Sequence, residues 1–290
     1  MEERTRSYES MGTRWRFSLW DAVSAETWAE ISAAVLRISE EFDRAYSRFI
    51  GTSLVRRLAT HTGDIEVPAD FMAMLNWYRK FSAPSRKKLN PLVGFTLSDL
   101  GYDADYSLTP RSTVRPVPDL DAAVQVLDEH RIRITEPVLF DFGALGKGYC
   151  IDKIAAYLKE KGLRRFLVDG SGDIFYSGNG APIRVGLEDP ADTTKVIGAI
   201  EMRNGSMASS SGNRRVWRDW HHIIDPDSLQ SPRDIIATWV IADAAVLADA
   251  LATSLFFAEP ERFSAFDFKY CILNKERRVR RSSGFAAELF

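Results

Sequence analysis

The chain has 290 residues, of which 45% are hydrophobic and 27% are charged, and its formal net charge is -2. This composition is typical of a folded globular protein and excludes a disordered or fibrous chain. Because positive charge is not in excess, attraction to nucleic acid or acidic lipid is not indicated, and no segment approaches the roughly eighteen apolar residues that a membrane-spanning helix needs.

The first third of the chain predicts one strand and two helices. Residues 13–20 alternate polar with bulky apolar side chains, which is typical of a half-buried strand. Ser24 is a candidate N-cap for a helix that continues to about Phe49, since apolar residues recur at three- and four-residue spacing. A second helix is expected over 68–81, with proline in its first turn. Residues 83–118 are rich in proline, serine and glycine and should form a loop with short helices.

The rest of the chain mixes helices with many strands. Helices are expected over 119–130, over about 147–161, where Gly162 is a natural left-handed C-cap, and over about 243–257. Strands are expected at 131–134, 138–140, 165–168, 174–177, 183–187, 196–202 and 237–242. Because these elements do not alternate regularly, the pattern favours an α+β fold over a doubly wound parallel sheet, in a single domain spanning 1–290.

The most informative segment is the run from Asp141 to Asp152, Asp-Phe-Gly-Ala-Leu-Gly-Lys-Gly-Tyr-Cys-Ile-Asp. Its three glycines let backbone amides approach an anion, the predicted helix start adds its positive end, and Lys147 supplies a charge. The spacing matches neither a Walker loop nor a dinucleotide fingerprint. The run therefore predicts a binding site for a phosphate compound of another kind.

A second motif lies about a hundred residues later, where Asp249 and Thr253 are four residues apart. On a helix this spacing places a carboxylate and a hydroxyl on one face. Hard oxygen ligands of this kind suit Mg²⁺, which usually takes one or two carboxylates from a protein. The alternative, an ordinary solvated helix face, is favoured when the pair is considered alone.

Three further segments have both a structural and a functional interpretation. The pair His221-His222 precedes Ile-Ile-Asp-Pro, so one ring could act as a base or both could be structural. Residues 169–174 form either a plain turn or a loop in which Asp173 accepts hydrogen bonds from a ligand's hydroxyl groups. Residues 205–212 are rich in serine and form either a flexible linker or a donor-rich cradle.

The two cysteines, Cys150 and Cys271, lie in apolar segments and are expected to be reduced core thiols. The charged N-terminus is followed by no apolar signal region. The chain as it stands is therefore expected to be cytoplasmic, or periplasmic if a leader was trimmed from it.

Taken in order, these segments resemble the FAD:protein FMN transferases, a flavin transferase family formerly called thiamine-biosynthesis lipoproteins. The resemblance covers nearly the whole chain. It is carried by Met11-Gly-Thr13, Ser47-Arg-Phe49 with Ser53-Leu54, Asn90-Pro91, Asp141 to Asp152, Gly172-Asp-Ile174, Gly186-Leu-Glu-Asp-Pro190, Ser210-Ser-Gly212, His222 to Pro226, and Asp249 to Thr253.

The resemblance implies a T-fold-like α+β protein, with two intertwined sheet-and-helix halves and FAD between them. It implies an enzyme that binds FAD and Mg²⁺, transfers FMN to a threonine of a target flavoprotein and releases AMP. Carried over by position, Asp249 and Thr253 would ligate Mg²⁺ with the carbonyl of Ala144. The FAD site would comprise Met11, Phe49, Lys88, Leu89, Asn90, Asp141, Lys147, Asp173 and Ser211.

His222 is the candidate base for the acceptor hydroxyl, since a pKa near neutrality suits a base at cellular pH. Asp249 could share this task, and a metal-bound alkoxide would need no side-chain base.

The chain departs from the family pattern in four places. Asn90 replaces a usual aspartate, and Gly146 stands where alanine is common. Leu229 and Ser231 fall where glycine and proline are usual, so the loop after His222 should have a different shape.

Two other functions are compatible with the same residues. With water as the acceptor, the site would be that of an FAD pyrophosphatase that releases FMN and AMP. A flavin-binding protein without catalysis is the third interpretation, although such a protein has no need of a metal-binding pair.

Overall fold

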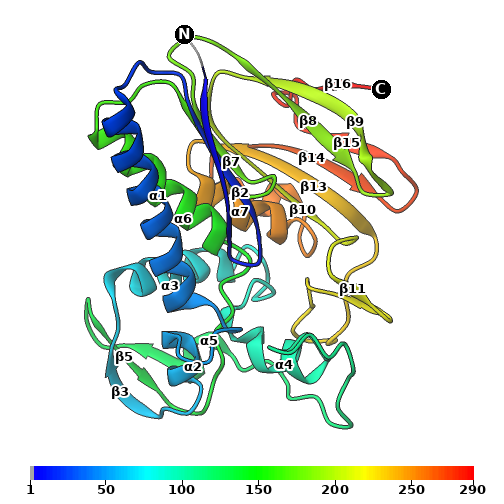
Figure 1. Ribbon diagram of the computed structural model, residues 1–290. Helices are drawn as coiled ribbons and strands as arrows, with labels where there is room; N and C mark the ends of the chain where they lie inside the picture. The colour runs from blue at the N-terminus through cyan, green and yellow to red at the C-terminus, as the bar shows by residue number, and fades with distance from the viewer. Residues whose placement is uncertain (1–2) are drawn as a thin grey trace.

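A central antiparallel sheet of eight strands organises the computed structural model, which describes residues 3–290 (Figure 1). The strands lie in the order β1-β2-β6-β7-β10-β13-β14-β15. Their bounds are Arg4–Ser10 (β1), Thr13–Leu19 (β2), Phe166–Asp169 (β6), Ile174–Ser177 (β7), Asn204–Ser211 (β10), Ile235–Ala242 (β13), Lys269–Asn274 (β14) and Val279–Arg281 (β15).

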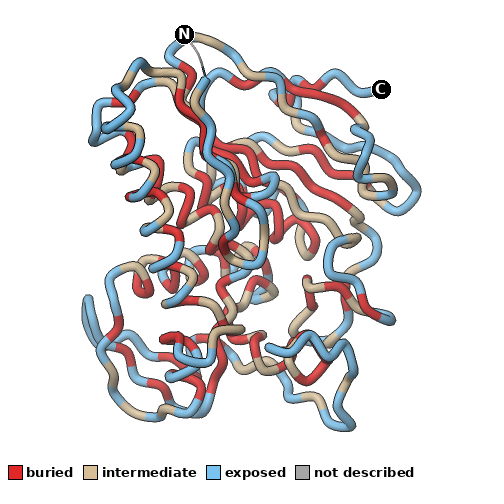
Figure 2. Tube along the Cα trace, viewed as in Figure 1, coloured by how far each residue is buried: buried red, intermediate tan, exposed pale blue. Residues whose placement is uncertain are grey.

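The two faces of this sheet are covered by different layers. One face packs against the helices α1 (Ala25–Tyr46), α6 (Gly146–Glu160) and α7 (Ala245–Ser254). Helix α3 (Ala69–Ser82) belongs to the same hydrophobic core. The other packs against a three-stranded sheet, which consists of β8 (Ile183–Asp189), β9 (Asp192–Met202) and β16 (Glu288–Leu289). Side chains alternate accordingly, because Phe166 and Val168 join the helical core whereas Leu167 joins the opposite one. Figure 2 shows the buried residues along the central strands and the helix faces turned to them.

The remaining elements lie mainly in the lower part of Figure 1. They are α2 (Leu54–Leu58), β3 (Gly63–Glu66), η1 (Pro91–Val93), α4 (Gly94–Asp99), α5 (Leu120–Ala123), β4 (Val124–Val126), β5 (Arg131–Ile134), β11 (Val216–Trp217), β12 (Trp220–His221) and η2 (Pro260–Phe263). Within residues 3–290, no helix combines the length and the apolar character required to cross a bilayer.

The four long helices and seven of the sixteen strands of the described chain were predictable, and the α+β class is confirmed. Helix α1 begins after Ser24, whose side chain accepts a hydrogen bond from Thr27 N at 3.0 Å. Helix α6 ends before Gly162, which has a φ of 77°. Both cysteines are buried and free, as expected.

Two predicted elements are wrong. The helix expected over 119–130 is only the four-residue α5, after which β4 pairs with β5 in a hairpin. The carboxylate of Asp128 accepts hydrogen bonds from the amides of His130 and Arg131, which stabilises the turn of this hairpin. The strand expected at 138–140 is an irregular buried segment, because its backbone pairs with the turn that carries Gly94.

Nine strands of the described chain were not predicted, namely β1, β3, β4, β10, β11, β12, β14, β15 and β16. Two of them, β10 and β1, border the cleft described below. The serine-rich segment 205–212 is mostly β10, a central strand against which α7 packs. Small side chains are required there, and Ser206 and Ala208 are fully buried. Strand β1 pairs with β2 through a turn at Met11 and Gly12, whose φ values of 51° and 67° are typical of a two-residue hairpin.

Candidate functional site

A cleft of about 1140 Å³ lies between the sheet and the loops below it, and it collects the residues singled out from the sequence. The predicted site residues that line it are Met11, Phe49, Lys88, Leu89, Asn90, Asp141, Ala144, Lys147, Ser211, His222, Asp249 and Thr253. Asp173 is the exception, because it lies beneath the lining. The fold therefore brings distant segments to one place, while the binding role of each residue stays a prediction.

Helices α6 and α7 cap one another at the base of the cleft. The Gly148 amide in the first turn of α6 donates to Asp249 Oδ2 at 2.9 Å. In return, Asp152 of α6 accepts hydrogen bonds from Ala245 N and Val246 N, at 2.8 and 2.9 Å, in the first turn of α7. Neither helix has a side-chain cap from its own N-cap residue. Each helix thus depends on the other for the satisfaction of its N-terminal amides.

The carboxylate of Asp249 is buried, with 2% of the residue exposed. Burial raises its pKa, although the nearby Lys147 charge and the Gly148 amide act in the opposite direction. Within residues 3–290, no hydrogen bond to Oδ1 is found, so this oxygen is free to bind a ligand. One turn further along the helix, the hydroxyl of Thr253 lies 3.2 Å from that of Ser210 on β10.

Lys147 forms an ion pair with Asp173, which the sequence had indicated as a ligand-binding residue. Asp173 is buried and also accepts a hydrogen bond from Ser209 N at 3.1 Å. Burial lowers the pKa of Lys147, while Asp249 raises it. The lysine charge is therefore shared between two carboxylates, and Asp173 acts here as the partner of the lysine.

The two adjacent histidines have different surroundings. His221 is buried, where its Nε2 lies 2.9 Å from the Pro232 carbonyl and its Nδ1 accepts from Ile223 N at 3.3 Å. His222 lines the cleft, and its Nδ1 lies 3.1 Å from the carbonyl of Arg214. Because a carbonyl only accepts, Nδ1 carries the hydrogen and Nε2 keeps its lone pair.

Burial, together with the positive charge of Arg215, lowers the pKa of His222 to about 3. The ring is therefore neutral near pH 7. A neutral imidazole with a free Nε2 can accept a proton, whereas His221 has both ring nitrogens engaged.

The start of the glycine-rich run is held in place by Asp141. Arg48 Nε donates to Asp141 Oδ2 at 2.6 Å, and Gly143 N donates to Oδ1 at 2.7 Å. The Arg48 guanidinium also lies 4.2 Å from the ring centroid of Phe49, which stacks on Tyr106 at 5.3 Å. Asp141 therefore shapes the turn before α6, and an aromatic pair borders the cleft beside it.

Several predicted cofactor-binding residues use their polar groups within the protein. The side chain of Asn90 accepts from Leu92 N and donates to the carbonyl of Pro118, both at 2.9 Å. Lys88 forms ion pairs with Asp225 and Asp227, both at 2.6 Å. These contacts show what each side chain does in the free protein.

The loop after His222 is held by Ser231, one of its two residues that depart from the family pattern. Ser231 Oγ accepts from His221 N at 2.8 Å and donates to the carbonyl of the same residue at 3.0 Å. Leu229 has a φ of 56°, in the left-handed region that glycine adopts easily. In this loop a serine therefore pairs with the histidine backbone, while the expected difference from the shape in relatives stays a prediction.

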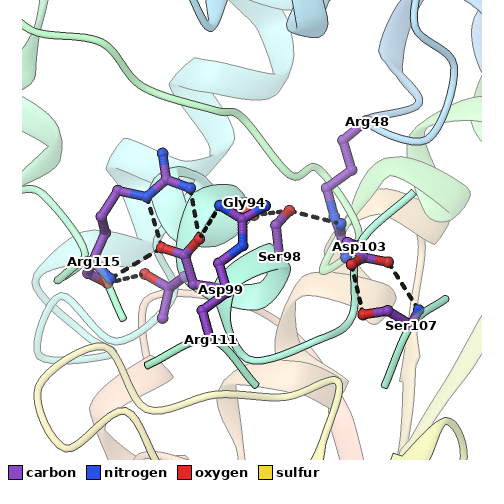
Figure 3. A network of polar contacts seen from close by, with 9 residues as sticks. Arg48, Gly94, Ser98, Asp99, Asp103, Ser107, Arg111 and Arg115 are labelled. Carbon is purple, nitrogen blue, oxygen red and sulfur yellow. Dashed lines mark hydrogen bonds and ion pairs between the residues drawn. The ribbon is translucent and has the colours of Figure 1, made fainter. Parts of the chain in front are cut away.

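A network around Asp99 supports the rim of the cleft (Figure 3). Arg115 Nε and Nη2 lie 2.6 and 2.7 Å from the two carboxylate oxygens of this buried residue, and Arg111 lies 3.5 Å away. Burial raises the pKa of Asp99, but the hydrogen bonds from Arg115 and the charges of both arginines outweigh it and lower the pKa overall. The network holds α4 and the following loop, which carries Tyr102 and Tyr106 at the cleft.

Sequence reasoning missed the roles of Arg48, Asp152 and Arg215. The capping by Asp152 had one signal, since the residue ends the glycine-rich run and α7 begins without a cap of its own. The pairing of Arg48 with Asp141 crosses 93 positions and left no local signal.

A buried carboxylate, a lysine and a neutral imidazole in one cleft, two of them with shifted pKa values, are typical of an enzyme active site. The model of the ApbE family matches residues 11–268, and the chain therefore belongs to that family.

Relatives and solved structures agree with this assignment. A FAD:protein FMN transferase of Rhodobacter capsulatus is 30% identical over 212 residues, which are 68% of this chain and 40% of that protein. A second FAD:protein FMN transferase, of Treponema pallidum, is 28% identical over 322 residues. That alignment includes 98% of this chain and 88% of the Treponema protein. The chain thus spans less than half the length of the first relative.

The fold is that of solved ApbE proteins. The crystal structure of an ApbE protein from Thermotoga maritima has a TM-score of 0.85 at 22% identity, with 98% of both chains covered. The flavin transferase ApbE of Vibrio cholerae has a TM-score of 0.79 at 20% identity, again with 98% of both chains covered.

Proposed function

We propose that this chain is a Mg²⁺-dependent enzyme that cleaves FAD and attaches FMN, through a phosphoester, to a threonine of a target flavoprotein, with release of AMP. Membership of the ApbE family and relatives named FAD:protein FMN transferase support the proposal. The observation that carries it is the cleft itself, where Asp249, Lys147 and His222 meet from segments that are far apart in the chain.

The reaction requires one bond to form and one to break. The acceptor hydroxyl oxygen attacks the phosphorus on the FMN side of the pyrophosphate, and the bond from that phosphorus to the bridging oxygen breaks. AMP leaves with the bridging oxygen. Such a transfer depends mainly on positioning and on stabilisation of charge on the phosphoryl oxygens. Lys147 and the amides at the start of α6 supply donors of this kind in the cleft.

His222 is the group proposed to take the proton of the acceptor hydroxyl. Its Nδ1 is occupied by the Arg214 carbonyl, so the proton would go to Nε2. The low pKa of His222 in the ligand-free protein keeps this nitrogen unprotonated. Bound phosphates would raise the pKa toward the range in which a base works well at neutral pH.

The residues present fit a magnesium ion. Asp249 offers a buried carboxylate oxygen without a hydrogen-bond partner in the described chain, and Thr253 offers a hydroxyl one helical turn away. Ala144 lines the same cleft and would offer its carbonyl. Residues 3–290 contain no cluster of three or more His, Cys, Asp or Glu suited to a metal, so a cation here would rely on phosphate and water for further ligands. When bound, Mg²⁺ would neutralise charge on the pyrophosphate.

The test is to incubate the protein with FAD, Mg²⁺ and a flavoprotein domain that carries a candidate acceptor threonine, and then to weigh the domain by mass spectrometry. An adduct with the mass of FMN, absent when the threonine is replaced by valine, is the expected result. Free FMN and AMP without an adduct would instead indicate an FAD pyrophosphatase. Unchanged FAD would leave a flavin-binding protein.

A further inference from the structure

The positive side chains of the cleft are almost all neutralised by the protein itself. Seven lysines and arginines line it, and the ion pairs among them are Arg16 with Asp169, Arg48 with Asp141, Lys88 with Asp225, Lys147 with Asp173, Arg184 with Glu288 and Arg214 with Glu188. Among residues 3–290, the seventh, Arg215, has no carboxylate within ion-pair distance. One cation of the lining thus remains available to a ligand.

The backbone around Arg215 fixes where this charge lies. The preceding residue, Arg214, is held by its ion pair with Glu188 at 2.6 Å and by the contact of its carbonyl with His222. Arg215 itself has a φ of 51°, in the left-handed region that costs an ordinary residue energy. The two neighbouring arginines therefore have different surroundings, since one is paired with Glu188 and the other lies over the cleft.

The position of the guanidinium is shown by its neighbours. It lies 5.9 Å from the ring centroid of Tyr102, on the aromatic side of the cleft. Its charge also reaches the catalytic groups. Burial is the main cause that lowers the pKa of His222, and the charge of Arg215 is the next. For Lys147, burial lowers the pKa, Asp249 opposes it, and Arg215 adds to the lowering.

We propose that Arg215 binds the pyrophosphate of FAD and stabilises the charge that develops during transfer. This inference rests on the proposed function, which supplies FAD as the ligand. A pyrophosphate diester carries two negative charges, and Lys147 can donate hydrogen bonds to it but shares its positive charge with Asp173, so a second cation is needed for charge balance. Arginine donates two parallel hydrogen bonds to phosphate oxygens, which makes it the group of choice for this task.

The experiment compares the affinities of purified variants for FAD and for riboflavin, which shares the isoalloxazine ring but has no phosphate. Because charge-assisted hydrogen bonds to the phosphates are lost, Arg215→Gln should weaken FAD binding by roughly tenfold or more. Riboflavin binding should change by less than about twofold, because no phosphate is involved. Inorganic pyrophosphate should compete with FAD less effectively in the variant, and Arg215→Lys should restore part of the affinity.

The matched control is Arg214→Gln, which removes the same charge from the adjacent position but breaks the ion pair with Glu188. It should leave the affinity for FAD near that of the unchanged protein. Two results would overturn the inference. One is an unchanged affinity of Arg215→Gln for FAD. The other is an equal loss of affinity for FAD and for riboflavin in this variant, which would indicate a distorted pocket. Failure of the proposed function would look different, because the unchanged protein would bind FAD through Arg215 and yet transfer no FMN.

Discussion

The reciprocal capping of α6 and α7 makes a prediction that joins stability to activity. In Asp152→Ala, two hydrogen bonds of 2.8 and 2.9 Å to the first turn of α7 are lost. Helix α7 has no other side-chain cap, and it carries Asp249 and Thr253. The substitution should therefore lower the stability of the protein and also shift the carboxylate on which the proposed transfer depends.

The magnitude follows from the kind of contact. Loss of an N-cap typically costs about 1 kcal/mol, and hydrogen bonds to a charged group contribute about 1.5 to 3 kcal/mol each. Burial of Asp152 raises its pKa and offsets part of the gain from the two amides. We therefore expect a loss of about 2 kcal/mol in the free energy of unfolding. Asp152→Asn can still accept one hydrogen bond and should lose about half as much.

The assay combines urea unfolding with steady-state FMN transfer at a temperature where every variant is folded. The matched control is Asp119→Ala, because Asp119 caps α5 through two similar hydrogen bonds of 3.0 and 3.1 Å and does not line the cleft. Both alanine variants should lose stability, but only Asp152→Ala should lose kcat, by roughly tenfold or more as expected for a misplaced catalytic group. A folded Asp152→Ala protein with the kcat of the unchanged enzyme would refute the reasoning.

Three further predictions concern the same region. Burial raises the pKa of Asp249, so a charged carboxylate destabilises the metal-free protein at neutral pH. Asp249→Asn should therefore raise the Tm of the metal-free protein, abolish any rise of the Tm on addition of Mg²⁺, and abolish transfer. A lower Tm of the metal-free variant would contradict this. A Cβ at Gly148 would lie 2.3 Å from the Ala245 carbonyl oxygen, so Gly148→Ala should push α6 away from α7. The variant should bind Mn²⁺ more weakly, as measured by electron paramagnetic resonance. An Mn²⁺ affinity equal to that of the unchanged protein would argue against this packing. The pKa of His222 is lowered to about 3 from an ordinary value of 6.5, so between these two pH values the unfolded chain binds a proton that the native chain does not. The free energy of unfolding should therefore fall as the pH is lowered from 6.5 to about 3, and it should fall less steeply in His222→Gln. If the ring is the base, His222→Ala should lower the transfer rate by roughly 10²-fold.

The parts of the fold that the sequence predicts are those with a strong local pattern. Helix α1 has a capping serine and apolar residues at helical spacing, and β2 alternates polar with apolar side chains. Strand β10 has neither signal, because a central strand under a helix needs small residues that are equally typical of loops. Strand β10 forms because it pairs with β7 and β13, and the composition of the segment itself carries no signal of these distant partners.

The same distinction applies to the site. The glycine-rich run and the pair Asp249 and Thr253 were recognisable, because spacing alone predicts a helix start and a shared helix face. That Asp152 caps the helix of Asp249 depends on packing between two helices 93 residues apart, and only the structure reveals it. The ion pair of Lys147 with Asp173 is similar, since it joins residues 26 positions apart and no local pattern predicts it.

The central claim is that the cleft moves the FMN half of FAD, with its phosphorus, onto a hydroxyl of another protein. The most direct measurement uses FAD labelled with ³²P at the phosphorus on the FMN side, Mg²⁺ and the acceptor domain, followed by separation of protein, FMN and AMP. The account predicts that the label appears on the acceptor in proportion to unlabelled AMP, and that Asp249→Ala abolishes both. Label found in AMP, or released only as free FMN while the acceptor stays unlabelled, would contradict it.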